Sequence, residues 1–599
     1  MKYGATPLES GGVQFRVWAP SVSRMGVRLV GNEDRAMTRA GEDFQIFIED
    51  ARPGDRYWLV LDGSKQRPDP CSRSQPEGVH GPSEIVDPDS SAWSDSNWKG
   101  MALSEYIFYE LHVGTFTPDG TFEGVLSKLS YLKDLGVTAV ELMPVAQFPG
   151  SRNWGYDGVD LYAPHCAYGG PNGLKSLVNT AHGVGLAVVL DVVYNHLGPE
   201  GNYLAEFGPF FTTRYQTPWG RAINFDGPGS DGVRRFFIDN ALYWLTEYHV
   251  DALRLDAIHG IFDCSAFHIL AEMRDRFHEQ AESLDRQAFL IAESDLNDVR
   301  VIQPRDKGGH ALDAQWHDGF HHSIVSVLTG AKRGYLADFG RLGHIQKAIT
   351  EGFVQDGIYS AYRQRRFGSS SRDEPGERLV AFLQDHDQVA NTAQGFRLSE
   401  LVSLEQCKLA AMLLLCSPYL PLLFMGEEFA ASAPFLYFTS HGDPALARAV
   451  SEGRREEFAD FAGAGEFADP QAAETFQKSR IDWALMDRPE QRGVRHLYGE
   501  LIGLRKRWPC LGNCRKDLTR VRIDEEAQWL RMERSDPSGS KALLLCNFSP
   551  NSAEFAIDDR PCWQLAACAG APPEASPGGV TISGRNAALY LDRRTQPGG

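Results

Sequence analysis

The sequence predicts an α/β protein whose central domain is a (β/α)₈ TIM barrel, preceded by an N-terminal β-sandwich and followed by a C-terminal β-domain. Three observations lead to this prediction. The chain has 599 residues, too many for one hydrophobic core. Its middle alternates short apolar runs with helical segments, which is typical of parallel strands covered on both faces. Both ends contain short runs rich in β-branched and aromatic residues, separated by turn residues.

The two terminal regions are predicted as β-structure because their apolar runs are short and closely spaced. The N-terminal sandwich is assigned to residues 1–95 and the C-terminal β-domain to residues 496–599. Strands are predicted in the first region at 14–18, 26–30, 44–48 and 57–61, and in the second at 528–532 and 542–547. A Pro- and Ser-rich stretch leads out of the first region.

The barrel is assigned to residues 96–495. The apolar runs predicted as its strands lie at 107–111, 137–142, 186–191, 251–256, 289–293, 311–315, 379–383 and 420–424. Eight strand–helix units of this kind fit a closed barrel, and the last three runs are the least regular.

Composition excludes several classes of function. The net charge of −19, with no basic stripe, argues against a nucleic-acid or anionic-membrane partner. No run is long and apolar enough to cross a bilayer, and the N-terminus has no apolar segment typical of a signal peptide. The ten cysteines are scattered, so they are interpreted as reduced thiols of a cytoplasmic protein.

Polar side chains follow the predicted barrel strands at the points where the strands end. Asp191 and His196 follow the third strand, Arg254 and Asp256 end the fourth, and Glu293 ends the fifth. Residues 385–387, Asp-His-Asp, follow the seventh. Strand carboxyl ends meet at the barrel mouth, where barrel enzymes have their active sites. A single aspartate in such a place is commonly the N-cap of the next helix, but four strands ending this way indicate a catalytic site.

These residue types suit hydrolysis of a glycosidic bond with retention of configuration. That reaction needs one carboxylate as nucleophile and one carboxylic acid as proton donor, about 5 Å apart. Arg254 lies two residues before Asp256, so on a strand both side chains point to one face, and the cation would keep Asp256 ionised. Glu293 is then the acid/base, and Asp387 is expected to bind sugar hydroxyls.

The sequence lacks the motifs that other kinds of active site require. The histidines have no compact zinc spacing, and Cys510 with Cys514 has no second pair to complete a metal site. No glycine-rich phosphate loop precedes a helix, and no nucleophile elbow is present. Aromatic residues after the second strand instead favour a sugar site: Tyr156 with Asp157 is interpreted as functional, whereas Trp154 fits a core position equally well.

Four segments together resemble the signature regions of the α-amylase superfamily of glycoside hydrolases, at 191–196, 253–259, 291–295 and 382–387. The resemblance implies that Asp256 is the nucleophile, Glu293 the acid/base and Asp387 the transition-state stabiliser. It implies substrate-binding roles for a further set of residues: Tyr156, Asp157, Asp191, His196, Arg254 and His386. The N-terminal sandwich is then expected to be similar to a carbohydrate-binding module.

Within the superfamily the chain resembles the malto-oligosyltrehalose trehalohydrolases over most of its length. The segments that carry this resemblance are 75–83, 109–122, 153–159, 291–298, 318–322 and 475–483. They imply hydrolysis of the α-1,4-glucosidic bond next to the terminal trehalosyl unit of malto-oligosyltrehalose, with release of trehalose. They also imply a pathway partner, malto-oligosyltrehalose synthase, and no metal or organic cofactor.

Residues that recognise the trehalose unit are expected among five positions: His259, Asp318, His321, His322 and Glu428. For Glu428 a capped turn is an equally good interpretation. The chain departs from the family pattern at Asp385, where Asn is usual. An extra carboxylate beside Asp387 would shift the pKa of a neighbour without removing a catalytic group.

The sequence leaves two rival functions open. A glucan-branching transferase of the same superfamily shares the sandwich, the barrel and the loop around Tyr156, and differs in whether water or a glucan hydroxyl accepts the sugar. A glycan-binding protein on an inactive barrel would be expected to lack a catalytic carboxylate, and all three are present.

Overall fold

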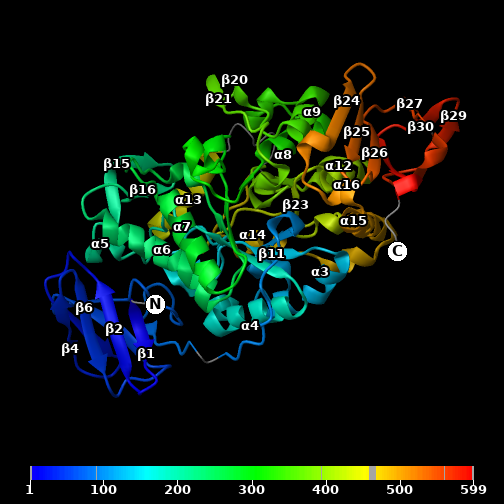
Figure 1. Ribbon diagram of the computed structural model, residues 1–599. Coiled ribbons are helices and arrows are strands. Elements are labelled where there is room, and N and C mark those ends of the chain that lie inside the picture. Colours follow the sequence, from blue (N-terminus) through cyan, green and yellow to red (C-terminus); the bar gives the residue numbers. More distant parts are fainter. Residues whose placement is uncertain (1–2, 89–90, 393, 458–466, 559, 596–599) are drawn as a thin grey trace.

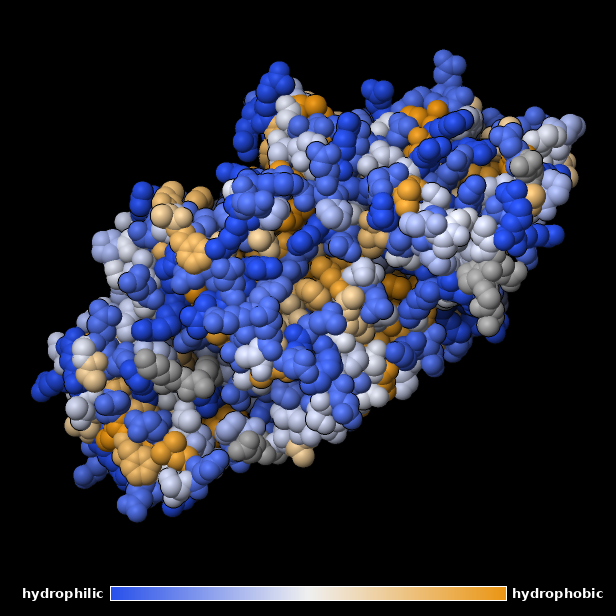
Figure 2. Space-filling model, in the orientation of Figure 1, coloured by the Kyte–Doolittle hydropathy of each residue, from blue (hydrophilic) through white to orange (hydrophobic). Residues whose placement is uncertain are grey.

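The computed structural model describes residues 3–88, 91–392, 394–457, 467–558 and 560–595. Figure 1 shows the N-terminal strands at one end of the molecule, the C-terminal strands at the opposite end, and the barrel between them. The visible face is largely hydrophilic, with small scattered hydrophobic patches (Figure 2), which fits the net charge of −19.

The N-terminal region consists of two antiparallel sheets. One has the order β1-β2-β6-β5 and the other β4-β3-β7-β8, with β9 also paired to β7. The bounds are β1 Gly4–Pro7, β2 Val13–Trp18, β3 Met25–Leu29, β4 Arg35–Ala36, β5 Thr38–Ala40, β6 Asp43–Ile48, β7 Arg56–Leu61, β8 Lys65–Arg67 and β9 Ser83–Glu84. Phe15 and Tyr57 pack edge to face between the sheets, with ring centroids 5.0 Å apart. The predicted sandwich and its four strands are confirmed.

The central sheet closes into a barrel of eight parallel strands, as predicted. In barrel order these are β10 Phe108–Leu111, β11 Ala139–Leu142, β14 Ala187–Val192, β17 Ala252–Leu255, β18 Phe289–Ala292, β19 Ala314–Trp316, β22 Leu379–Phe382 and β23 Leu420–Phe424. The sixth strand, β19, is shorter than predicted and begins later. Its expected first residue, Ala311, has φ 62°, a left-handed conformation that cannot continue a strand.

Helices surround the barrel (Figure 1). The longer ones are α3 Leu129–Leu135, α4 Gly170–Gly183, α6 Ser230–Glu247, α7 Ile269–Ser283, α8 Asp318–Thr329, α9 Leu342–Thr350, α12 Leu404–Cys416 and α13 Pro444–Glu457. Shorter elements are α1 Val113–Phe116, α2 Phe122–Leu126, β12 Ala146–Gln147, β13 Asp160–Pro164, α5 Leu204–Phe207, β15 Phe211–Thr217, β16 Gly220–Ile223, β20 Asp356–Ser360, β21 Arg365–Gly368, α10 His386–Ala390, α11 Leu398–Leu401 and α14 Ala473–Lys478. No helix in the described ranges is both long and apolar enough to span a membrane.

The C-terminal region is again built from two antiparallel sheets, ordered β24-β25-β26-β31-β28 and β27-β30-β29. The bounds are β24 Thr519–Asp524, β25 Trp529–Ser535, β26 Lys541–Asn547, β27 Ala553–Ala556, β28 Trp563–Cys568, β29 Glu574–Ser576, β30 Gly579–Ile582 and β31 Asn586–Asp592. Helices α15 Pro489–Arg507 and α16 Pro509–Gly512 precede them. The predicted boundary at 495/496 falls within α15, and the division of the chain into domains stays a prediction.

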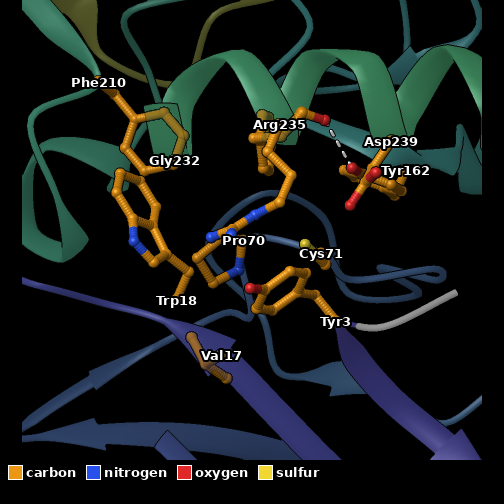
Figure 3. Close-up of a pocket in the computed structure, with 11 residues that line it drawn as sticks. Tyr3, Val17, Trp18, Pro70, Cys71, Tyr162, Phe210, Gly232, Arg235 and Asp239 are labelled. Carbon is orange, nitrogen blue, oxygen red and sulfur yellow. Dashed lines mark hydrogen bonds between the residues drawn. The ribbon is translucent and has the colours of Figure 1, made fainter. Parts of the chain in front are cut away.

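The N-terminal sandwich meets the barrel through aromatic packing (Figure 3). Trp18 packs edge to face on Phe210, with centroids 5.3 Å apart. Gly232, at the start of α6, allows this approach, because a Cβ there would lie 2.0 Å from the Trp18 ring. Tyr3, Trp18 and their neighbours leave a cavity of about 20 Å³, room for about one water molecule.

Candidate active site

One buried guanidinium organises the barrel mouth. Arg254 lies on β17 and is fully buried; its Nη1 donates to Asp191 Oδ2 at 2.8 Å and to Asp256 Oδ1 at 2.7 Å. Its Nη2 lies 3.7 Å from Glu293 Oε2. The guanidinium also stacks 4.4 Å from the centroid of the Trp316 ring. Burial lowers the pKa of Arg254, but the surrounding carboxylates raise it well above its ordinary value, so the group is a permanent cation.

Asp256 is held at both carboxylate oxygens. Oδ1 accepts from Arg254, and Oδ2 accepts from Asn195 Nδ2 at 3.0 Å. Asn195 Oδ1 in turn lies 2.6 Å from His196 Nδ1. The two donors fix the orientation of this carboxyl group. Asn195 was not among the predicted site residues, although it lies within the segment 191–196 that was singled out.

Glu293 follows β18, the strand adjacent to β17. Its Oε2 accepts from the backbone N–H of Ala257 at 2.5 Å. Ala257 directs that N–H toward the carboxylate by adopting a left-handed conformation, φ 37° and ψ 52°. Burial raises the pKa of Glu293, and nearby Arg254 opposes the shift without cancelling it. A carboxyl group with a raised pKa is suited to proton donation.

Asp387 is the most open of the three predicted catalytic carboxylates. It lies in the first turn of α10, and its side chain is 48% exposed. Its Oδ2 is 3.6 Å from His386 Nε2. The carboxylate is therefore free to meet a ligand from the solvent side of the mouth.

Tyr156 and His386 form a stacked pair next to these carboxylates. The Tyr156 hydroxyl lies 2.7 Å from both Asp191 Oδ2 and His386 Nε2, and the two rings stack with centroids 5.3 Å apart. The other imidazole nitrogen, Nδ1, lies 2.5 Å from Glu110 Oε1. Burial raises the pKa of Asp191 to about 7 despite the opposing charge of Arg254. Glu110 was missed, because it lies 276 residues from His386.

The loop after the second strand supplies further predicted residues. Asp157 Oδ2 accepts from Asn153 at 2.6 Å. Trp154 is 3% exposed, donates to the Leu436 carbonyl and packs on Phe435 and His386. Of its two interpretations, the core position is confirmed.

A second group of predicted residues lies near Glu293 and β22. Glu293 contributes to raising the pKa of Asp318, although burial is the larger cause. His259 Nδ1 is 3.9 Å from Asp295 Oδ1. His321 is buried, and its Nδ1 lies 2.5 Å from the Leu383 carbonyl. Burial lowers its pKa to about 4, so it is a neutral imidazole. His322 stacks on Tyr335, with centroids 4.6 Å apart.

Glu428 lies away from the ligand-accessible mouth. It is fully buried, and its carboxylate accepts from the hydroxyls of Tyr109 at 3.1 Å and Tyr131 at 2.7 Å. Its donors are tyrosines of the barrel wall rather than a turn, which leaves no open face for a sugar. The proposed role of Glu428 in trehalose recognition is therefore wrong.

Asp385 caps α10. Its side chain accepts from the Gln388 backbone N–H at 2.7 Å. Burial, and then the charge of Glu110, raise the pKa of Asp385 well above its ordinary range. In the part of the chain that the structure describes, no group of three His, Cys, Asp or Glu side chains is arranged to hold a metal ion.

Comparisons with known proteins agree with this geometry. The family model for the α-amylase catalytic domain matches residues 82–215. A malto-oligosyltrehalose trehalohydrolase from Saccharolobus solfataricus is 48% identical, over 92% of this chain and 93% of the relative. The chain belongs to the malto-oligosyltrehalose trehalohydrolases. A second relative of that name, from Arthrobacter ramosus, is 45% identical over 83% of this chain and 87% of its own length.

This trehalohydrolase-family chain also matches solved structures. A putative α-amylase from Salmonella typhimurium superimposes with a TM-score of 0.90 at 40% identity, covering 98% of this chain and 99% of the other. By contrast, a 1,4-α-glucan branching enzyme from Corynebacterium jeikeium is 28% identical over 53% of this chain and 50% of its own. The likeness to this branching enzyme thus covers about half of each chain.

Proposed function

We propose that this chain hydrolyses the α-1,4-glucosidic bond next to the terminal trehalosyl unit of malto-oligosyltrehalose, releasing trehalose and a malto-oligosaccharide. The observation that carries the proposal is the Arg254 guanidinium, which binds Asp256 directly and lies 3.7 Å from Glu293. Because this cation contacts Asp256 directly and lies farther from Glu293, it favours Asp256 as the ionised nucleophile and Glu293 as the protonated acid, the two roles that a retaining glycosidase requires.

In the first step, Glu293 gives its proton to the glycosidic oxygen while an Asp256 oxygen attacks the anomeric carbon. The bond to the leaving sugar breaks, and a covalent glycosyl-enzyme forms. In the second step, Glu293 takes a proton from water, which attacks the same carbon and frees Asp256. Asp387 stabilises the positive charge that develops on the sugar ring in both steps.

The remaining predicted residues are proposed to bind substrate around these carboxylates. Tyr156, Asp191, Arg254 and His386 share one hydrogen-bonded group beside Asp256, which supports a place around the sugar to be cleaved. Asp157 and His196 are proposed to lie on the same side. For the leaving trehalosyl unit we propose His259, Asp318, His321 and His322, which lie near Glu293 and β22.

The decisive test is incubation with maltopentaosyl-trehalose. Free trehalose and maltopentaose are expected in equimolar amounts, measured by chromatography. Absence of trehalose would refute the proposal, and new α-1,6 branches on amylose would favour the branching alternative. Because the proposed steps use only side chains of this chain, activity is expected to survive dialysis against EDTA; a loss restored by a divalent metal would contradict that part.

The cellular setting is proposed on chemical grounds. All ten cysteines are unpaired, which supports a reducing compartment such as the cytoplasm. The substrate carries a trehalosyl end that another enzyme must make, so a malto-oligosyltrehalose synthase is the proposed pathway partner. Other α-1,4-glucans are proposed as weaker ligands of the same site.

A further inference from the structure

We propose that Glu110 is a positioning residue that keeps His386 doubly protonated, so that an imidazolium rather than a neutral imidazole faces the sugar site. The inference rests on the proposed function for its catalytic consequence, but the charge state itself is independent of it. Glu110 lies on β10, is 1% exposed, and has no part in the steps above.

The argument begins with the Tyr156 hydroxyl, which has a single proton. It is 2.7 Å from Asp191 Oδ2 and 2.7 Å from His386 Nε2. Asp191 Oδ2 also accepts from Arg254 at 2.8 Å, so this oxygen is an acceptor and not a donor toward Tyr156. The hydroxyl therefore donates to Asp191, and its oxygen accepts a hydrogen from His386 Nε2.

The opposite side of the ring gives the second proton. His386 Nδ1 lies 2.5 Å from Glu110 Oε1, and the other oxygen, Oε2, accepts from the backbone N–H of His386 at 3.2 Å. One proton therefore lies between Nδ1 and Oε1. Because the acidic groups around the ring favour the proton on the imidazole, we place it on Nδ1, and with both nitrogens protonated the ring is a cation.

The charged groups around the ring support this state. Facing it are Glu110 on β10, Glu141 on β11, Asp191 on β14, Asp385 and Asp387 at α10, and His112 after β10. Burial lowers the pKa of His386, but Asp387, Glu110 and Asp385 raise it to about 10. Burial lowers the pKa of His112 to about 4, so it adds no competing charge.

Glu141 provides an internal comparison. It is the Cα register partner of Glu110 on the adjacent strand and is equally buried, 1% exposed. Unlike Glu110, it has no hydrogen-bond partner at either oxygen within the described residues. Burial and then the charge of Glu110 raise the pKa of Glu141 well above its ordinary range, so it is a neutral acid. Of these two adjacent carboxyl groups, Glu110 is the one that contacts His386.

The consequence for the reaction is a fixed donor at the sugar site. An imidazolium holds Tyr156 through Nε2 and presents its charge to Asp387, 3.6 Å away. Without Glu110, burial would favour the neutral ring, which has a hydrogen on only one nitrogen. A neutral ring with its hydrogen on Nδ1 would leave the Tyr156 hydroxyl without a donor, and one with its hydrogen on Nε2 would keep that donor but present no positive charge to Asp387.

The experiment compares Glu110→Gln with Glu141→Gln, two isosteric changes at neighbouring buried positions. With maltopentaosyl-trehalose at pH 7.5, Glu110→Gln is expected to lower kcat about 10- to 100-fold, less than the roughly 10²- to 10⁴-fold that a general acid or base itself contributes, because Glu110 acts only through His386. Activity of this variant should recover as pH falls toward 5.5, because protons then restore the imidazolium. Glu141→Gln should keep the wild-type kcat within about threefold and the wild-type pH profile.

A second measurement tests the charge state without substrate. The Cε1–H NMR signal of His386, assigned by its loss in His386→Asn, should keep the imidazolium shift up to about pH 9 in the full-length wild-type protein and titrate at lower pH in Glu110→Gln.

A neutral His386 in the wild type at pH 7 would overturn the proposal. So would a Glu110→Gln variant whose activity loss is the same at every pH, or whose behaviour matches Glu141→Gln. If no trehalose is released by the wild type, the proposed function fails while the NMR result still decides this inference.

Discussion

The two ends of strand β17 carry aspartates in contrasting surroundings. Asp256 follows the carboxyl end, with donors on one side and an accessible mouth on the other. Asp251 precedes the amino end and is fully enclosed: its oxygens contact Val188 N at 2.8 Å, His182 Nε2 at 2.9 Å and Trp98 Nε1 at 2.7 Å. One short strand thus separates a carboxylate available for chemistry from one used wholly for structure.

The largest expected effect is at the mouth. Asp256→Asn removes the nucleophile while keeping the shape, and its single oxygen accepts from either Arg254 or Asn195. The rate of trehalose release should fall at least about 10⁴-fold, with little change in KM. Steady-state kinetics and thermal unfolding measure the two properties separately. A variant within tenfold of the wild-type rate would exclude Asp256 as nucleophile.

Asp251→Asn should have the opposite effect, a loss of stability with little change in rate. Removing the charge takes a buried carboxylate away from Arg286 and leaves His182 with Asp95 alone, so the free energy of unfolding should fall by about 3–5 kcal/mol. Denaturant unfolding measures this loss. The kcat of the folded fraction should stay within a fewfold of the wild type. If kcat fell with unchanged stability, the division between the two ends would be wrong.

The histidine at the barrel base predicts a pH dependence. Burial lowers the pKa of His182, but Asp251 and Asp95 outweigh it and raise the net value above 6.5. The folded protein therefore holds this proton more tightly than the unfolded chain. Its stabilising contribution is complete below about pH 6.5 and is lost as pH rises through the folded pKa. His182→Gln should flatten this decline in melting temperature between pH 6.5 and 9.

The smallest effect is expected from Asp385→Asn at the mouth. Because burial raises the pKa of this carboxyl group in the folded state, the wild type loses stability as pH rises above about 4, where the unfolded chain ionises. Asn keeps the cap on Gln388 and has no such titration. The melting temperature of the variant relative to the wild type should therefore rise from pH 4 to 7. A constant difference would mean that Asp385 is ionised in the fold.

Sequence patterns predicted the barrel because each strand is a short apolar run, and they predicted the carboxylates because these end the runs. Asn195 and Glu110 escaped prediction for different reasons. Asn195 lies in the right segment, but an amide next to a histidine has no distinctive spacing. Glu110 meets His386 only because the barrel closes and pairs β10 with β23, the strand next to β22, a contact without a local pattern. The packing of Trp18 on Phe210 is similarly remote in sequence.

The spacing between neighbouring barrel strands also bears on the stereochemistry of the product. Asp256 and Glu293 follow adjacent strands in register, with Leu255 paired to Ala292. Hydrogen-bonded neighbours in any sheet lie about 4.8 Å apart, and a double-displacement mechanism needs its two carboxyl groups about 5–5.5 Å apart. The pitch of the β-sheet is thus already close to the span of that reaction. An inverting reaction needs its two carboxyl groups about 6.5–9.5 Å apart, more than this pitch, so the pairing of the two strands fits retention.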